Sequence, residues 1–209
     1  MLFYDCSTAP SPRRARMFVA EKGLEIETRD ISIAKGEQLS DAFRAVNPGA
    51  TIPVLVTDEG TTLTENLGIA AYLEARFPEP PLMGRTADEK GEVLMWSAVA
   101  EQQCGAPIAE TLRNTHPSFK DRAITGPANH AQIPELAQRG AGRVRTFYDL
   151  LETRLRESDF VAADSFTLAD ITTFVFVDFA RIIKVRIPTE NAATLAWFDT
   201  IQARASAQR

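Results

Sequence analysis

The feature that most constrains this sequence is a proline that interrupts a strand-like stretch. Thr51 and Ile52 are β-branched residues typical of a strand, and Pro53 follows them directly, ahead of another apolar run. Because proline has no N–H to donate to a central ladder, it belongs in a special turn rather than in mid-strand. Cis peptide bonds are almost confined to X-Pro, so we expect a cis bond before Pro53.

This turn and the helix that follows it indicate a site for a small peptide with a carboxylate. The turn leaves a backbone amide and carbonyl next to Pro53 free to pair with an extended ligand. Farther along, Glu65 and Asn66 open an apolar helix, where unpaired N–H groups favour an anionic group. The alternatives are a turn that serves only the fold and an ordinary helix N-cap at Glu65-Asn66.

Composition narrows the class of protein. A chain of 209 residues can form one large domain or two small ones with a core. Its net charge of -5 argues against nucleic acid as a partner. The basic run RRAR at 13–16 is interpreted as a solvated helix face with one structural arginine. Two cysteines are too few for a disulfide framework. No run reaches the roughly 18 apolar residues that span a bilayer, so we expect a cytoplasmic protein.

The hydrophobic period changes along the chain and predicts two domains. Strands are expected at 1–4, 25–31, 54–57 and 61–64, and helices at 13–22, 40–46 and 66–77. This βαβαββα order is thioredoxin-like. Prolines at 78–81 mark a linker. From residue 87 onward the periods are helical only, with breaks expected near 126–129 and 140–142. The prediction is an α/β thioredoxin-like N-terminal domain, residues 1–79, followed by an all-α C-terminal helical domain, residues 86–209.

Four motifs stand in one order along the chain. They are SPRRAR at 11–16 leading to AEKGL at 20–24, NP at 47–48 with IPVL at 52–55, LTENLGIAAYL at 63–73, and SFTLADI at 165–171. Each is weak alone, but together the sequence resembles the bacterial cytosolic glutathione transferases over nearly its whole length. The THP at 115–117 resembles a motif from a bacterial branch of that family. The resemblance implies glutathione as co-substrate, a small and often hydrophobic electrophile, a role in detoxification, a homodimer and no metal.

The same resemblance implies roles for individual residues. The backbone of Ile52, before Pro53, would hold the cysteinyl part of glutathione. Glu65 would pair with the ammonium of the γ-glutamyl end, and the helix N-terminus at Asn66 would hold its carboxylate. Family members usually carry serine after the glutamate, but an asparagine side chain can also donate to a carboxylate.

The catalytic position departs from the family's pattern. The chemistry needs a hydroxyl or thiol at the start of the first helix, where it can stabilise the glutathione thiolate. Ala9 occupies that position and supplies neither group. Ser11 is the first candidate in its place, with Ser7, Thr8 and Cys6 as others from the same loop. Ser11 is alternatively a helix N-cap, and Cys6 is either a partner in a mixed disulfide or a small buried residue.

Other groups are interpreted as mainly structural. A helix over 89–113 should face the glutathione domain, with Gln103 and Pro107 among the residues that line a pocket for the second substrate. The TLAD sequence at 167–170 has the spacing of a capping box. The apolar stretch 174–179 predicts a buried helix. His116 and His130 lack further ligands at metal-binding spacing, so no metal site is expected.

The sequence therefore favours a glutathione S-transferase-like enzyme whose bound thiolate attacks an electrophilic carbon, sulfur or peroxide oxygen. Two alternatives stay open. One is a glutathione-dependent disulfide reductase or peroxidase that uses Cys6 or only the bound glutathione. The other is a non-catalytic binding protein that kept the fold, and Ala9 and Asn66 are the features that favour it.

Overall fold

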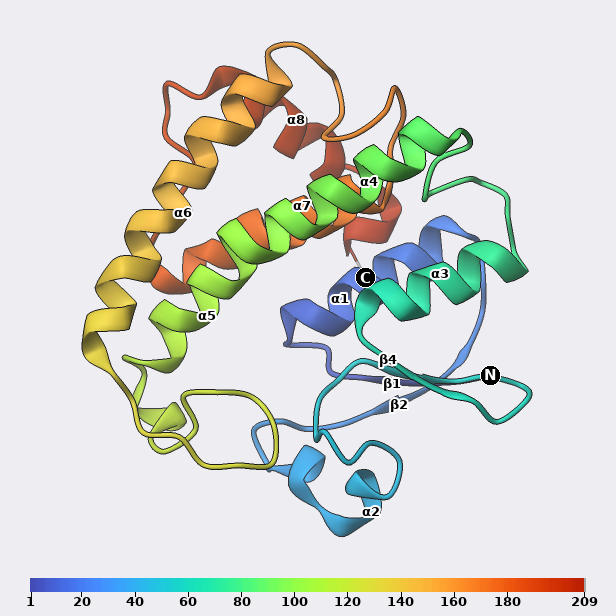
Figure 1. Ribbon diagram of the computed structural model, residues 1–209, viewed down its shortest axis with the longest axis vertical. Helices are drawn as coiled ribbons and strands as arrows, with labels where there is room; N and C mark the ends of the chain where they lie inside the picture. Colours follow the sequence, from blue (N-terminus) through green and yellow to red (C-terminus); the bar gives the residue numbers. More distant parts are fainter. Residues whose placement is uncertain (209) are drawn as a thin grey trace. The chain divides into compact units, whose positions relative to one another are not determined.

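The computed structural model describes residues 1–208, which form two compact units (Figure 1). The first unit comprises Met1–Pro80 together with Ile124–Ala128. The second comprises Pro81–Ala123 and Asn129–Gln208. That these units act as the predicted domains of residues 1–79 and 86–209, with glutathione held by the first, stays a prediction.

A four-stranded sheet with helices on both faces makes up the first unit (Figure 1). The strands are β1 (Leu2–Asp5), β2 (Glu27–Asp30), β3 (Val54–Val56) and β4 (Thr62–Thr64), in the order β2-β1-β3-β4. β2 runs parallel to β1, whereas β3 is antiparallel to β1 and to β4. Helices α1 (Pro10–Glu21) and α3 (Asn66–Arg76) lie on one face, and η1 (Glu37–Leu39) and α2 (Asp41–Arg44) lie on the other. The thioredoxin-like prediction is confirmed, including the hairpin between β3 and β4.

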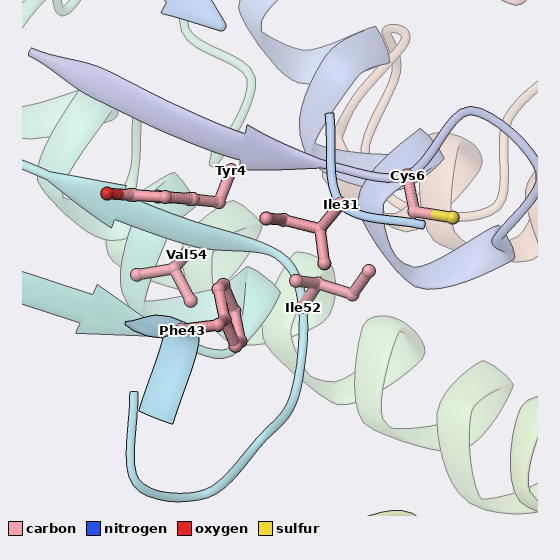
Figure 2. Packing of buried hydrophobic residues seen from close by; sticks show 6 residues of the cluster. All are labelled: Tyr4, Cys6, Ile31, Phe43, Ile52 and Val54. Carbon is pink, nitrogen blue, oxygen red and sulfur yellow. The ribbon is translucent and has the colours of Figure 1, made fainter. Parts of the chain in front are cut away.

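Alternation along β1 builds a core on each side of the sheet. Phe3 pairs with Leu55, and both are buried. The next residue, Tyr4, points to the opposite face, because successive side chains of a strand alternate. There its ring meets Phe43 of α2 edge to face, with 5.7 Å between ring centroids. Figure 2 shows the cluster around this pair, which comprises Tyr4, Cys6, Ile31, Phe43, Ile52 and Val54.

Helix α1 begins three residues earlier than the sequence predicts. Pro10 occupies its first position, where a missing N–H removes no helical hydrogen bond. Ala9 is therefore the N-cap, and no side chain among the described residues caps this end. The interpretation of Ser11 as an N-cap is thus wrong, because Ser11 lies inside the first turn. At the other end Gly23 has φ +65°, and the amide of Leu24 donates to the Val19 carbonyl at 3.0 Å, which closes the helix as predicted.

The second unit is helical, as predicted. Its α-helices are α4 (Ala87–Ala100), α5 (Ala106–Arg113), α6 (Pro134–Leu155), α7 (Leu168–Phe179) and α8 (Ala192–Gln202), joined by the π-turn η2 (Glu101–Gly105) and the 3-10 turns η3 (Pro117–Phe119), η4 (Ala180–Ile183) and η5 (Ala205–Gln208). Helix α7 is buried from Leu168 to Val177. The predicted capping box at its start, between Thr167 and Asp170, is confirmed. Within residues 1–208, no helix is both long and apolar enough to span a membrane.

Two expectations for this unit are wrong. The single helix over 89–113 is instead interrupted by η2, a π-turn that ends two residues before Pro107. Pro107 has no N–H for the carbonyl of Gln103, so the ordinary helical bond at that position is unavailable. The expected break at 140–142 lies inside the unbroken helix α6. Glycine is needed at position 140 of α6 because α5 packs closely against it: a Cβ at Gly140 would lie 2.5 Å from Thr111 Oγ1.

Candidate functional site

The loop between β1 and α1 is tied down at its backbone. The amide of Cys6 donates to Asp5 Oδ1 at 2.7 Å, and the amide of Ser7 donates to Asp30 Oδ1 at 3.3 Å. From α1, Arg16 donates to the carbonyls of Cys6 at 3.2 Å and Ser7 at 3.4 Å. The loop thus enters α1 in a fixed path. It leaves Ser7 exposed and Cys6 buried, as the structural alternative for Cys6 predicts.

Two prolines leave Ser11 as the main hydrogen-bonding residue in the first turn of α1. Its first three residues are Pro10, Ser11 and Pro12, so only Ser11 carries an N–H there. That amide donates to no backbone carbonyl within residues 1–208. The helix N-terminus also carries a partial positive charge. The start of α1 is therefore suited to an anion held near Ser11.

The Ser11 hydroxyl is already an acceptor of two hydrogen bonds. Asn66 Nδ2 donates to Ser11 Oγ at 2.9 Å, and Arg14 Nη2 donates to the same atom at 3.4 Å. A serine hydroxyl has two acceptor lone pairs and one hydrogen to donate. With both lone pairs engaged, the hydrogen of Ser11 is left for a ligand.

The turn at Pro53 has the geometry that the sequence predicts. The Ile52-Pro53 peptide bond is cis. Asn47 braces the approach, because its Nδ2 donates to the Thr51 carbonyl at 2.8 Å and its Oδ1 accepts from the Gly49 amide at 2.9 Å. Neither the amide nor the carbonyl of Ile52 forms a hydrogen bond within the described chain. These two groups are therefore available to an extended ligand.

Side-chain packing brings this turn to the loop before α1. Ile52 belongs to the same buried cluster as Cys6, and Ala9 packs against that cluster. Figure 2 shows the side chains of Ile31 and Ile52 facing one another, with Cys6 at the end of β1. The turn and the start of α1 therefore border one region of the first unit.

The start of α3 holds the two residues predicted for the γ-glutamyl end. Glu65 is exposed at the N-cap position with φ +61°, a backbone region that non-glycine residues rarely adopt and that clusters at ligand sites. Its side chain makes no capping bond, so it does not act as the ordinary N-cap of the alternative interpretation. Asn66 is only 7% exposed, and its buried Oδ1 has no hydrogen-bond partner in the part of the chain that the structure describes.

The structure thus brings together some predicted site residues and not others. Ser11 joins Asn66 directly, and Ile52 joins Cys6 through the cluster. Cys6 Sγ lies 3.4 Å from Thr8 Oγ1, which gives the thiol a local partner. The hydroxyl of Ser7 forms no side-chain hydrogen bond that links it to the other candidates. Gln103 and Pro107 belong to the second unit, and their role at a second-substrate pocket stays a prediction.

Two arginines beside the site are structural, one more than the sequence predicts. The RRAR run is predicted to contain one structural arginine, but two are structural: Arg14 is 4% exposed, and Arg16 holds the loop before α1. A clue is present in the sequence: these arginines share a helix with buried residues such as Ala15 and Met17. Arg14 donates to Ser11 within the same helix, whereas Arg16 donates to Asp5, Cys6 and Ser7, which precede α1.

This arrangement can bind a peptide and stabilise an anion next to it. The unpaired backbone groups of Ile52 suit an extended peptide, and the Ser11 amide and hydroxyl suit a negatively charged atom such as a thiolate. Among residues 1–208 no group of three or more His, Cys, Asp or Glu side chains is placed to hold a metal ion. The chemistry supplied by these residues is hydrogen bonding at a helix N-terminus.

Comparison with known proteins agrees with this geometry. Residues 8–76 match the glutathione S-transferase N-terminal domain family, and residues 134–203 match the glutathione S-transferase C-terminal domain family. Glutathione S-transferase 2 of Saccharomyces cerevisiae is 33% identical over 212 residues, which cover 100% of this chain and 88% of the yeast protein. The chain belongs to the glutathione S-transferase family.

Solved structures of this family superpose over the whole chain. The crystal structure of Gtt2 from Saccharomyces cerevisiae has a TM-score of 0.90 at 32% identity and covers 100% of this chain and 99% of that one. A glutathione S-transferase domain-containing protein from Marinobacter aquaeolei has a TM-score of 0.87 at 31% identity, covering 99% of each chain. Similar glutathione transferases thus occur in yeast and in bacteria, and the predicted family and fold are confirmed.

Proposed function

We propose that this protein is a glutathione S-transferase that binds glutathione in its first unit and ionises the thiol for attack on a small electrophile. Support comes from its membership of the family and from the groups that converge near the start of α1. Glutathione is then the co-substrate, and the reaction joins its sulfur to an electrophilic atom.

The binding roles follow the available hydrogen-bonding groups. The amide and carbonyl of Ile52, ahead of Pro53, pair with the cysteinyl backbone of glutathione, since no group among residues 1–208 uses them. Glu65 is exposed and charged, and it pairs with the γ-glutamyl ammonium. The N-terminus of α3, with Asn66, receives the γ-glutamyl carboxylate.

The Ser11 hydroxyl donates to the glutathione sulfur. The single observation that carries this role is the hydrogen bond from Asn66 Nδ2 to Ser11 Oγ, 2.9 Å long, which joins the expected γ-glutamyl position to the expected thiol position. The helix dipole of α1 adds to the stabilisation of the thiolate. Both effects favour the ionised form, so the bound thiol loses its proton more readily than the free thiol.

The two other candidates of the loop are less suited to this role. Ser7 lies outside α1 and lacks the partners that orient Ser11. Cys6 is 3% exposed, which hinders a mixed disulfide with glutathione. The other cysteine, Cys104, is a buried free thiol of the second unit. These facts favour transferase chemistry over disulfide reduction through Cys6.

We also infer the cellular setting of the protein and the nature of its second substrate. The protein acts as a cytoplasmic homodimer in detoxification, and its second substrate is a small, often hydrophobic electrophile held with the help of Gln103 and Pro107. The support for these points is the family resemblance of the sequence.

Conjugation kinetics with glutathione and an activated aryl chloride test the catalytic role. Ser11→Ala should lower kcat/KM by about tenfold to a hundredfold, because it removes a donor to a charged sulfur. Ser7→Ala is the matched control, and it should stay within about twofold of wild type. Full activity in Ser11→Ala, together with a large loss of activity in Cys6→Ser, would show that catalysis depends on Cys6 and not on Ser11. No turnover by the folded wild type across electrophiles and peroxides would favour the non-catalytic alternative.

A further inference from the structure

One hydrogen bond connects the two helix starts of the candidate site. Asn66 is the first residue of α3 and Ser11 the second residue of α1, so the bond joins residues far apart in the sequence. Asn66 is 7% exposed, and its amide is therefore held by packing rather than by solvent. A buried amide of this kind has few other orientations.

The direction of this bond decides what Ser11 can do. Because Asn66 Nδ2 is the donor, Ser11 Oγ is the acceptor and keeps its own hydrogen. Arg14 Nη2 also donates to Ser11 Oγ, at 3.4 Å, and points the hydroxyl the same way. Had a carboxylate stood at position 66, it would have accepted the serine hydrogen instead.

We propose that Asn66 is a positioning residue for thiol activation: its amide occupies a lone pair of Ser11 Oγ and directs the Ser11 hydrogen to the glutathione sulfur. This inference rests on the proposed function and deepens it. On binding, the thiol proton leaves to solvent, while Ser11 donates a hydrogen bond and keeps its own proton. The amide thereby sets the pKa of the bound thiol without touching the sulfur.

The remaining atom of the amide fits the same role. Asn66 Oδ1 is buried and has no hydrogen-bond partner within residues 1–208. A buried acceptor without a partner is costly, and a ligand N–H donor would satisfy it. Accepting such a bond would polarise the amide and strengthen its donation to Ser11.

The test is a double-mutant cycle on the pKa of the bound glutathione thiol, read from ultraviolet absorbance of the thiolate against pH. Ser11→Ala should raise that pKa by about one, the size of one hydrogen bond to a charged atom. Asn66→Ala should raise the thiol pKa by an amount between roughly half of that rise and the whole of it. In the Ser11→Ala background, Asn66→Ala should add almost nothing. Leu67→Ala, an exposed neighbour on α3, is the matched control and should leave the thiol pKa unchanged.

Asn66→Asp keeps the shape of the side chain and reverses its hydrogen bonding. Its carboxylate can only accept, so it takes the Ser11 hydrogen, and the thiol pKa should rise further than in Asn66→Ala. In the Ser11→Ala background, Asn66→Asp should change the thiol pKa only through the through-space effect of the new carboxylate charge.

The outcomes separate this inference from the function beneath it. The positioning role would be overturned if Asn66→Ala raised the thiol pKa equally with and without the Ser11 hydroxyl. It would also be overturned if Asn66→Ala weakened glutathione affinity and left the thiol pKa unchanged. Neither result would argue against glutathione binding by the wild type. Failure of the folded wild type to bind glutathione would overturn the proposed function itself.

Discussion

Arg16 Nη1 lies 2.5 Å from Asp5 Oδ1, and both side chains are largely buried, at 16% and 9% exposure. The same guanidinium donates to the carbonyls of Cys6 and Ser7. This pair therefore fastens α1 to the end of β1 and sets the path of the loop that leads to Ser11. The geometry of the candidate thiol site depends on an ion pair outside it.

Arg16→Gln should lower the free energy of unfolding by about 2–3 kcal/mol, because it leaves the Asp5 carboxylate buried without its cation. The matched control is Arg181→Gln. Arg181 also lies 2.5 Å from its partner, Asp178, but is 55% exposed, and we expect a loss of about 0.5 kcal/mol or less. Urea denaturation of both variants makes the comparison. Equal losses would show that burial of the Arg16 pair adds nothing.

Lys22 is a buried ammonium with three acceptors around it. Its Nζ donates to the carbonyls of Phe77 at 2.8 Å and Pro80 at 2.5 Å, and it forms an ion pair with Glu74. Lys22→Met should destabilise the protein by about 3–5 kcal/mol, since it leaves a carboxylate and two carbonyls without their cation. Lys35 is exposed in the same unit and provides the control: Lys35→Met should change the free energy of unfolding by about 0.5 kcal/mol or less. Thermal melting of both variants checks this, and a mild effect of Lys22→Met would refute it.

Two glycines of α6 should respond in opposite directions to alanine. A Cβ at Gly140 would lie 2.5 Å from Thr111 Oγ1 and 2.6 Å from the Pro107 carbonyl, so Gly140→Ala should cost about 1–3 kcal/mol by forcing α5 and α6 apart. Gly142 has nothing within 4 Å of such a Cβ. Gly142→Ala should therefore stabilise the helix by up to about 1 kcal/mol. Denaturation midpoints that fall together in both variants would contradict the close packing at Gly140.

Asp170, the buried acid of the capping box of α7, should make stability depend on pH. Burial raises the pKa of Asp170 to about 6, against the opposing effect of hydrogen bonds from Val161, Trp197 and Thr167. Because the folded-state pKa of Asp170 lies above the unfolded one, protonation of Asp170 contributes to the free energy of unfolding. That contribution is fully present below about pH 4 and is lost as the pH rises through about 6. Carbon-13 NMR of the Asp170 carboxyl should show a midpoint near pH 6. A midpoint near 4 would contradict the shift.

Much of the fold could be predicted from local signals. Pro53 after two β-branched residues predicts the turn, Gly23 predicts the end of α1, and the spacing of Thr167 and Asp170 predicts the start of α7. Each is a short-range effect of backbone geometry or capping, so one sequence suffices to find it. The α1 boundary was missed because prolines suggest a loop, although the first turn needs no N–H from them.

Features set by tertiary packing escaped prediction. Gly140 looked like a helix break, but it is the point where α5 comes close. The motifs predicted Glu65, Asn66 and Ser11 as separate candidates, yet nothing in their spacing predicts that Asn66 donates to Ser11. That bond exists because α1 and α3 pack against each other in the first unit. The role of Arg16 in holding the loop escaped for the same reason.

Calorimetric titration with reduced glutathione, on the wild type and on Glu65→Ala, tests whether the first unit binds glutathione through its γ-glutamyl end. We predict wild-type binding with a Kd in the micromolar to low millimolar range. Glu65→Ala should bind about tenfold or more weakly, because the γ-glutamyl ammonium loses its charged partner. No heat of binding from the folded wild type would contradict glutathione binding, and equal affinity in the Glu65→Ala variant would contradict the role of Glu65.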